Sequence, residues 1–110
     1  MKQMACLLAV SVLALPLGAS AQTVNTSQAE ALLKKSGCTK CHSVSSKKEG
    51  PPFKEVAAKY KGKPDGAAAV TKMITTNPKI KVDGREETHD ALKTKSDAEI
   101  KNVVAYILSR

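Results

Sequence analysis

The chain has 110 residues, which is enough for one domain. Lysine and arginine outnumber aspartate and glutamate by 18 to 10, giving a net charge of +8. The aromatic side chains are one Phe and two Tyr, with no Trp, and domains near this size rarely fold on side chains alone. The composition therefore argues against an ordinary side-chain core and favours a large apolar group inside the domain.

The first 21 residues have the layout of a secretory signal peptide. A basic start at Lys2 precedes an apolar run over residues 4–15, and the small residues Ala19 and Ala21 mark a cleavage site. The apolar run is too short for a membrane-spanning helix, which needs about 20 residues. We therefore expect cleavage after Ala21, export to the periplasm without a membrane anchor, and a mature domain of residues 22–110.

The mature domain keeps 17 basic and 10 acidic residues, a net charge of +7. Such an excess favours electrostatic steering toward acidic partner proteins. Nucleic acid is the competing partner, but export argues against it. The lysines are also spread along the whole chain, as on a solvated surface.

Two helices are expected in the first half of the mature chain, within an all-α domain. Ser27 and Glu30 match the reciprocal capping pattern of a helix start. Gly37 is placed to end that helix, which is expected over residues 27–36. Apolar side chains at helical spacing predict the second helix over residues 53–60.

The second half is expected to hold two more helices and no strand. The third helix begins at an Asp65 cap and runs to about residue 75. Its predicted inner face comprises Val70, Met73 and Ile74. Residues 77–95 show no clear period, and so long a loop in a compact domain is usually functional or disordered. Ser96 and Glu99 form a second capping box before the clearest apolar helical stripe in the chain.

The sequence Cys38-Thr39-Lys40-Cys41-His42 is the C-x-x-C-H signature of haem attachment. The two thiols add across the two haem vinyl groups, and the two residues between them give the required separation. His42 follows at once, so its imidazole can reach the iron as the proximal ligand. We therefore predict one haem c, bound covalently by Cys38 and Cys41.

Three other chemistries use cysteine pairs of this kind. A thioredoxin-like motif is expected near a βαβ pattern, and the sequence shows none. A structural zinc site needs four protein ligands, and the two histidines of the mature chain are 47 residues apart. A disulfide is the third alternative in an exported protein, but the spacing and the adjacent His42 favour haem.

With these features, the mature chain resembles the small bacterial class I cytochromes c along its whole length. A helix ends at Gly37 just before the haem motif, and Gly50-Pro51 follows His42 after eight residues. The resemblance implies the cytochrome c fold, with four to five short helices wrapped around one covalent haem. It also implies that the backbone carbonyl of Pro51 contacts the proximal His42, which is a contact that tunes a metal ligand.

The resemblance further implies that the first and last helices cross. Leu33 and Tyr106 are expected to meet near that crossing, in front of Cys38. The haem edge is expected to be partly exposed near Cys38 and Cys41. Lysines expected to guide acidic partners to this edge are Lys40, Lys47, Lys48, Lys93 and Lys95. Arg85 and nearby lysines are candidates for binding the haem propionates.

The sequence departs from the family at the distal iron ligand. In most relatives this ligand is a Met in the loop before the last helix, but residues 82–93 contain no Met. They contain His89, in about the family's Met position. Met73, the only methionine of the mature chain, lies too early, in the third predicted helix. We therefore favour His89 as the distal ligand, with Met73 and an open iron site as alternatives.

The choice of distal ligand bears on function. Thioether sulfur raises the reduction potential, whereas imidazole favours ferric iron, so a His42/His89 pair predicts a low potential. Two filled axial positions leave no substrate site, which predicts a periplasmic one-electron carrier that is not an enzyme. Two alternatives stay open: a gas-binding or sensor haem protein with a displaceable His89, and the cytochrome subunit of a larger periplasmic oxidoreductase.

Overall fold

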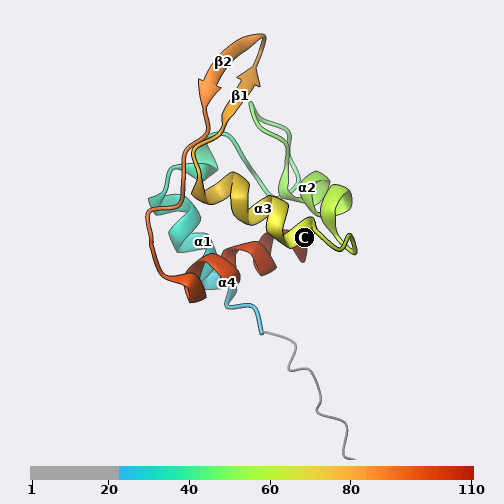
Figure 1. The fold of residues 1–110 in the computed structure, drawn as a ribbon, viewed down its shortest axis with the longest axis vertical. Helices are drawn as coiled ribbons and strands as arrows, with labels where there is room; N and C mark the ends of the chain where they lie inside the picture. Colours follow the sequence, from blue (N-terminus) through green and yellow to red (C-terminus); the bar gives the residue numbers. More distant parts are fainter. Residues whose placement is uncertain (1–22) are drawn as a thin grey trace, which may run out of the picture.

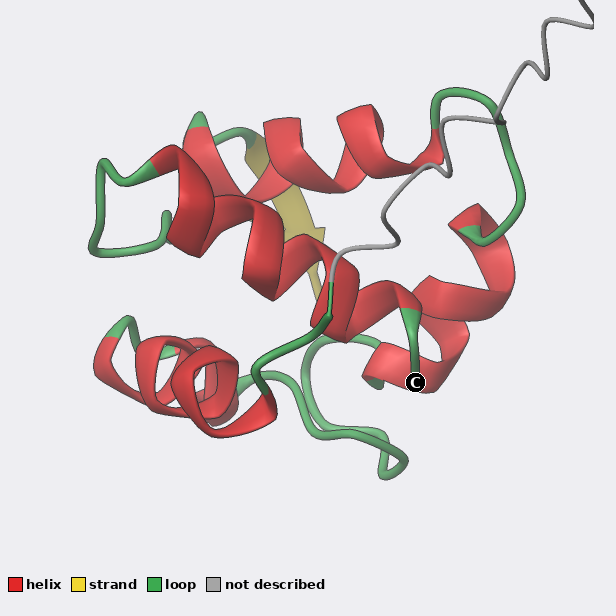
Figure 2. Cartoon of the chain, turned by 90° about the horizontal axis from the view of Figure 1, so that it is seen from below, coloured by secondary structure: helices red, strands yellow, loops and turns green. Residues whose placement is uncertain are grey.

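The computed structural model describes residues 23–110, so the predicted signal peptide lies outside the described residues. The elements in chain order are α1 (Thr26–Lys35), a 3-10 turn η1 (Cys38–Lys40), α2 (Phe53–Tyr60), α3 (Gly66–Thr75), β1 (Lys79–Val82), β2 (Arg85–Thr88) and α4 (Asp97–Leu108). Helices and connecting loops make up nearly all of the described chain (Figure 2). The predicted helix-dominated class is therefore confirmed.

Helices α1 and α4 are joined near the start of α1. The cap of α1 is Asn25, whose side chain accepts a hydrogen bond from the Gln28 amide, so the predicted capping role of Ser27 is wrong. The Asn102 side chain of α4 accepts from the Asn25 amide at 2.8 Å and donates to the Asn25 carbonyl at 2.9 Å. These two hydrogen bonds connect the start of α1 to α4. Asn102 itself is almost fully buried.

The core lies between α4 and the other helices, which all pack against it (Figure 1). It contains Ala29, Leu32, Leu33, Phe53, Val70, Ile74, Leu92, Val103, Val104, Tyr106 and Ile107. The predicted neighbours Leu33 and Tyr106 both belong to this cluster, and Cys38 packs against it. The end of α1 and the haem motif are therefore anchored on the same core as α4.

Three predictions for the second half of the chain need correction. The expected loop contains an antiparallel hairpin, β1–β2, which projects from the helical body (Figure 1). Its two-residue turn consists of Asp83 and Gly84, both at positive φ, which is the turn conformation that suits the twist of a hairpin. Met73 is 39% exposed rather than on the inner face of α3. Asp65 precedes α3 but its side chain makes no capping hydrogen bond.

The last helix follows its prediction closely. The Ser96 side chain accepts from the Glu99 amide at 3.3 Å and so caps α4. The inner face of α4 is buried along most of its length, at Val103, Val104, Tyr106 and Ile107. None of the helices within residues 23–110 has both the length and the apolar character needed to cross a membrane.

Candidate haem site

The haem motif lies on a single tight turn directly after α1. Gly37 ends α1 with a φ of 79°, a left-handed conformation that favours glycine. The amides of Cys41 and His42 both donate to the Cys38 carbonyl, at 3.2 and 3.0 Å. The Cys38 and Cys41 thiols are free and half-buried. One turn of backbone therefore presents two thiols and an imidazole within five residues.

Both thiols are in surroundings that disfavour the thiolate. Burial raises the pKa of Cys38, and the charge of Asp90 raises it further. Burial also raises the pKa of Cys41. The carboxylate of Glu49, which lies 3.7 Å from the Cys41 sulfur, raises it further. Both thiols are therefore harder to ionise than a free cysteine.

His42 is held from several sides. Its Nδ1 lies 2.7 Å from the Pro51 carbonyl oxygen, the contact that the family resemblance implies. When Nδ1 donates to this carbonyl, Nε2 is left with the lone pair that binds a metal. The ring also stacks on Phe53, with centroids 5.5 Å apart and planes inclined by 16°. A Cβ at residue 50 would lie only 2.6 Å from the His42 ring, so Gly50 makes room for it.

His89 lies across from His42, immediately after β2. The centroids of the two imidazole rings are 6.1 Å apart and their planes are inclined by 54°. A metal–imidazole nitrogen bond of about 2 Å, with about 1 Å more to each ring centre, places the centroids of two trans ligands about 6 Å apart. The separation of the His42 and His89 rings therefore suits a shared metal ion.

The surroundings of the His89 ring also suit a ligand role. Its Nδ1 is buried and has no hydrogen-bond partner among the described residues, and buried polar atoms normally have one. Burial, followed by the nearby His42, lowers the pKa of His89, so the ring is neutral at pH 7 and able to bind a metal. Met73, the alternative, lies on the exposed side of α3. The residues present therefore fit a haem held by two thioethers and two imidazoles.

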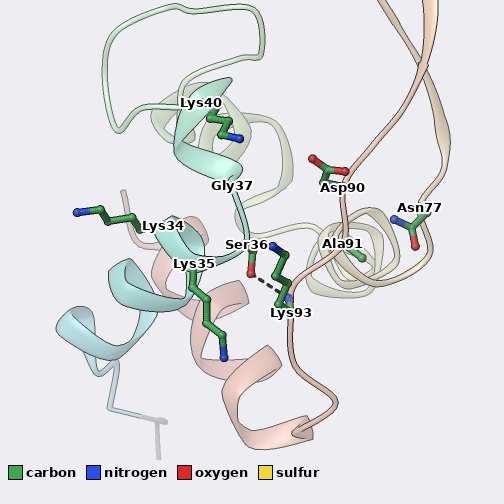
Figure 3. Close-up of a pocket in the computed structure, with 9 residues that line it drawn as sticks. All are labelled: Lys34, Lys35, Ser36, Gly37, Lys40, Asn77, Asp90, Ala91 and Lys93. Atoms are coloured by element: carbon green, nitrogen blue, oxygen red, sulfur yellow. Dashed lines mark hydrogen bonds between the residues drawn. The ribbon is translucent and has the colours of Figure 1, made fainter.

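A basic pocket of about 370 Å³ lies beside the haem motif and the residues that follow His89 (Figure 3). It is lined by Lys34, Lys35, Ser36, Gly37, Lys40, Asn77, Asp90, Ala91 and Lys93. Of the lysines predicted around the haem edge, Lys40 and Lys93 line the pocket, whereas the other three do not. Lys34 and Lys35 also line the pocket and were not predicted, although both lie in the last turn of α1, directly before the motif.

The pocket lysines carry charge that the protein itself leaves uncompensated. Within residues 23–110 the ion pairs are Arg85–Glu87 and Lys101–Asp97, and neither involves a pocket lysine. Asp90 is the only acidic side chain in the lining. The lining therefore holds four lysines against one carboxylate, which makes the pocket positively charged.

A tight turn that presents two thiols and a histidine in the C-x-x-C-H order is typical of a c-type haem protein, and similarity to known proteins agrees. The chain belongs to the cytochrome c family, whose model matches residues 27–110. The class 1 cytochrome MtoD of Sideroxydans lithotrophicus ES-1 is 42% identical, with a TM-score of 0.75, over 79% of this chain and 97% of that one. Cytochrome c552 of Nitrosomonas europaea is 31% identical, with a TM-score of 0.56, over 73% and 96%.

The curated relatives match over shorter stretches. Cytochrome c-551 of Pseudomonas denitrificans is 47% identical over 53 residues, which are 48% of this chain and 65% of that protein. Cytochrome c-552 of Nitrosomonas europaea is 50% identical over 48 residues, or 47% of its own length. The chain thus spans about half to two thirds of these relatives.

Family membership confirms several predictions from the sequence. Cytochrome c family proteins carry one covalently attached haem c, as the motif predicted. The family and the named relatives are cytochromes rather than enzymes. Residues 23–110 contain no group of three or more His, Cys, Asp or Glu side chains that could hold a metal ion.

Proposed function

We propose that this chain is a one-electron carrier in which Cys38 and Cys41 hold the haem while His42 and His89 bind its iron. The main support is the 6.1 Å separation of the two imidazole rings, which suits trans ligands. When bound, the haem supplies the ferric–ferrous couple. Cys38 and Cys41 would hold the haem and His42 and His89 would supply the iron ligands, which would leave no iron site for a substrate.

The polypeptide controls the proximal ligand through its hydrogen bond and its packing. The Pro51 carbonyl accepts a hydrogen bond from the Nδ1–H of His42, which fixes the tautomer and makes the imidazole a stronger electron donor. Phe53 holds the plane of the ring by stacking. A ligand fixed in this way moves little between oxidation states, and small movement favours fast electron transfer.

We further propose that the reduction potential is low, because imidazole replaces the sulfur ligand found in most relatives. His89→Met tests this by restoring a sulfur ligand at the same position. We expect a higher midpoint potential in potentiometry and a new sulfur-to-iron charge-transfer band in the far red. His89→Gln is the control, since it removes the imidazole without supplying sulfur. An unchanged potential in His89→Met would overturn His89 as the ligand.

Carbon monoxide separates this carrier from a gas-binding protein. With both axial positions filled, the ferrous protein should bind CO slowly, because His89 must leave first. In His89→Ala the position opens and CO should bind at a rate limited by diffusion into the site. Equally fast CO binding to both proteins would favour the gas-binding alternative.

We propose that the protein works in the periplasm and that its partners dock through acidic surfaces onto the lysine pocket. The exported layout of residues 1–21 supports the location, and the four unpaired lysines support the kind of partner. Lys40→Gln with Lys93→Gln should slow electron exchange with an acidic partner and weaken its dependence on salt. Lys47→Gln with Lys95→Gln removes the same charge outside the pocket lining and should change both less.

The native oligomeric state separates a free carrier from a subunit of a larger oxidoreductase. Size-exclusion chromatography of the protein from its source should give a small monomer. Stable elution with a larger redox protein would instead support the subunit alternative.

A further inference from the structure

The segment that carries His89 is tied to the body of the protein by hydrogen bonds on both sides. The His89 amide donates to the Pro78 carbonyl at 2.8 Å, and the Asn77 side-chain amide donates to the His89 carbonyl at 3.1 Å. The next two bonds run from the Leu92 amide to the Ile74 carbonyl and from the Lys93 amide to the Ser36 hydroxyl, both at 2.9 Å. Asn77 therefore supplies the side-chain bond to the backbone of His89 itself.

We infer that Asn77 is a positioning residue that sets the orientation of the His89 ring toward the iron, an inference that rests on the proposed His42/His89 ligation. Asn77 lies in the left-handed region, with a φ of 51°, where Asn is one of the few tolerated residues. Asn77 lies two residues before β1, and His89 lies one residue after β2. The hydrogen bond from the Asn77 side chain to the His89 carbonyl therefore joins the two segments that flank the hairpin.

The hairpin adds a second constraint on His89. Its last cross-strand pair is Lys79 with Thr88, so His89 follows directly outside the ladder. A slip of one residue in the pairing would turn each β2 side chain to the opposite face. The two positive-φ residues of the turn, Asp83 and Gly84, fix the register at the other end. The turn fixes the register of the hairpin, and the Asn77 hydrogen bond holds the His89 backbone, so both constrain the direction from which the imidazole leaves the chain.

The measurable consequence is the angle between the two ligand planes, which is 54° in the structure. Phe53 and Pro51 hold the His42 plane, so changes at Asn77 should move only the His89 plane. The EPR g-values of a low-spin ferric haem depend on that angle. Asn77→Gly is the informative variant, because glycine keeps the positive φ without strain while losing the hydrogen bond.

The test compares Asn77→Gly with Thr76→Ala in the holoprotein. Thr76 is the adjacent exposed residue, and its hydroxyl bonds within α3 to the Lys72 carbonyl. We expect Asn77→Gly to remain low-spin with shifted g-values and to bind CO about fivefold faster in the ferrous state, equivalent to the roughly 1 kcal/mol of one hydrogen bond. Thr76→Ala should match the wild type in both measurements.

The outcomes separate this inference from the proposed function. Wild-type g-values and CO rates in Asn77→Gly would overturn the positioning role of Asn77, provided that His89→Ala loses the low-spin spectrum. If His89→Ala retains the wild-type spectrum, the His42/His89 pair is wrong and the inference falls with it. A similar shift in Thr76→Ala would show a general effect of this helix end and would equally overturn the specific role of Asn77.

Discussion

The two proposed iron ligands are held by different kinds of structure. His42 rests on the core, because Phe53 stacks on it and in turn meets the buried Tyr106 edge-on at 6.2 Å. His89 rests on a hairpin whose second strand is exposed throughout, and it is held mainly by backbone hydrogen bonds. The position of His42 should therefore be lost only when the protein unfolds, whereas the position of His89 can change while the fold stays intact.

The largest expected effect comes from Phe53, which connects His42 to the core. Phe53→Ala should lower the free energy of unfolding by about 3–5 kcal/mol, the usual cost of a large-to-small aromatic change in a core. Chemical denaturation of the holoprotein measures this loss. Val44→Ala is the control, because Val44 is 36% exposed and its loss should cost at most about 0.5 kcal/mol. Equal midpoints for the two variants would contradict a proximal ligand built on the core.

The next largest effect is expected at Gly50, which lies against the His42 ring. In Gly50→Ala the new methyl group would lie 2.6 Å from the ring, so the ring or the backbone must shift, at a cost of about 1–3 kcal/mol. The EPR g-values should change together with stability. Gly66→Ala is the matched comparison, since its methyl group would clash with the Tyr60 backbone carbonyl and should reduce stability without altering the spectrum.

A smaller effect on stability is expected at Tyr106, which packs against Phe53. The Tyr106 hydroxyl donates to a Glu30 carboxylate oxygen at 3.0 Å, so Tyr106→Phe should cost about 1 kcal/mol. Tyr60→Phe is the control, because no hydrogen bond of the Tyr60 hydroxyl is found within residues 23–110. An equal loss in both variants would argue against the Tyr106–Glu30 bond.

The contribution of the Tyr106 hydroxyl to stability should also depend on pH. Burial, followed by the Glu30 carboxylate, raises the pKa of Tyr106, so the folded state holds the hydroxyl proton more tightly than the unfolded state. This stabilisation is complete below the usual tyrosine pKa of about 10 and is lost as the pH rises through the raised value. The stability advantage of the wild type over Tyr106→Phe should therefore shrink in alkaline solution. A constant advantage up to strongly alkaline pH would contradict this.

The smallest effect on global stability is expected on the distal side. Gly84 has a φ of 78° in the hairpin turn, and an alanine there costs about 1 kcal/mol locally. Gly84→Ala should leave the unfolding midpoint nearly unchanged and yet speed CO binding to the ferrous protein. Gly62→Ala has the same strain, at a φ of 75°, in the turn between α2 and α3, and should not affect CO binding. A large drop in global stability in Gly84→Ala would show that the hairpin belongs to the core.

The same contrast explains what the sequence could predict. The helices and the motif are local patterns: the Ser96 cap, the apolar stripe of α4 and the C-x-x-C-H spacing can each be recognised within a dozen residues. The hairpin was missed although two signals were available. Its first strand alternates lysine with the half-buried Ile80 and Val82, and the Asp83-Gly84 dipeptide favours a two-residue hairpin turn. The second strand shows no such alternation, because three of its four side chains are charged and all four are exposed.

Other features of the site depend on tertiary contacts that no local pattern contains. The stacking of Phe53 on His42 joins residues from two separate segments. The hydrogen bonds between the Asn102 side chain and the Asn25 backbone are likewise long-range. The Asn25 cap itself is local, because Asn is a favoured N-cap residue and its side chain accepts from the Gln28 amide. Met73 has helical spacing next to Ile74, but α3 is covered by α4 only along a narrow stripe, which leaves Met73 exposed.

The most direct test of the ligand pair is the absorption spectrum of the purified ferric protein, extended into the far red. Ligation by His42 and His89 predicts a low-spin spectrum without a sulfur-to-iron charge-transfer band. The presence of that band would contradict the pair and make Met73 the ligand, which would require α3 to turn its exposed side toward the iron. A high-spin spectrum would contradict it in another way, by showing an iron that His89 does not bind.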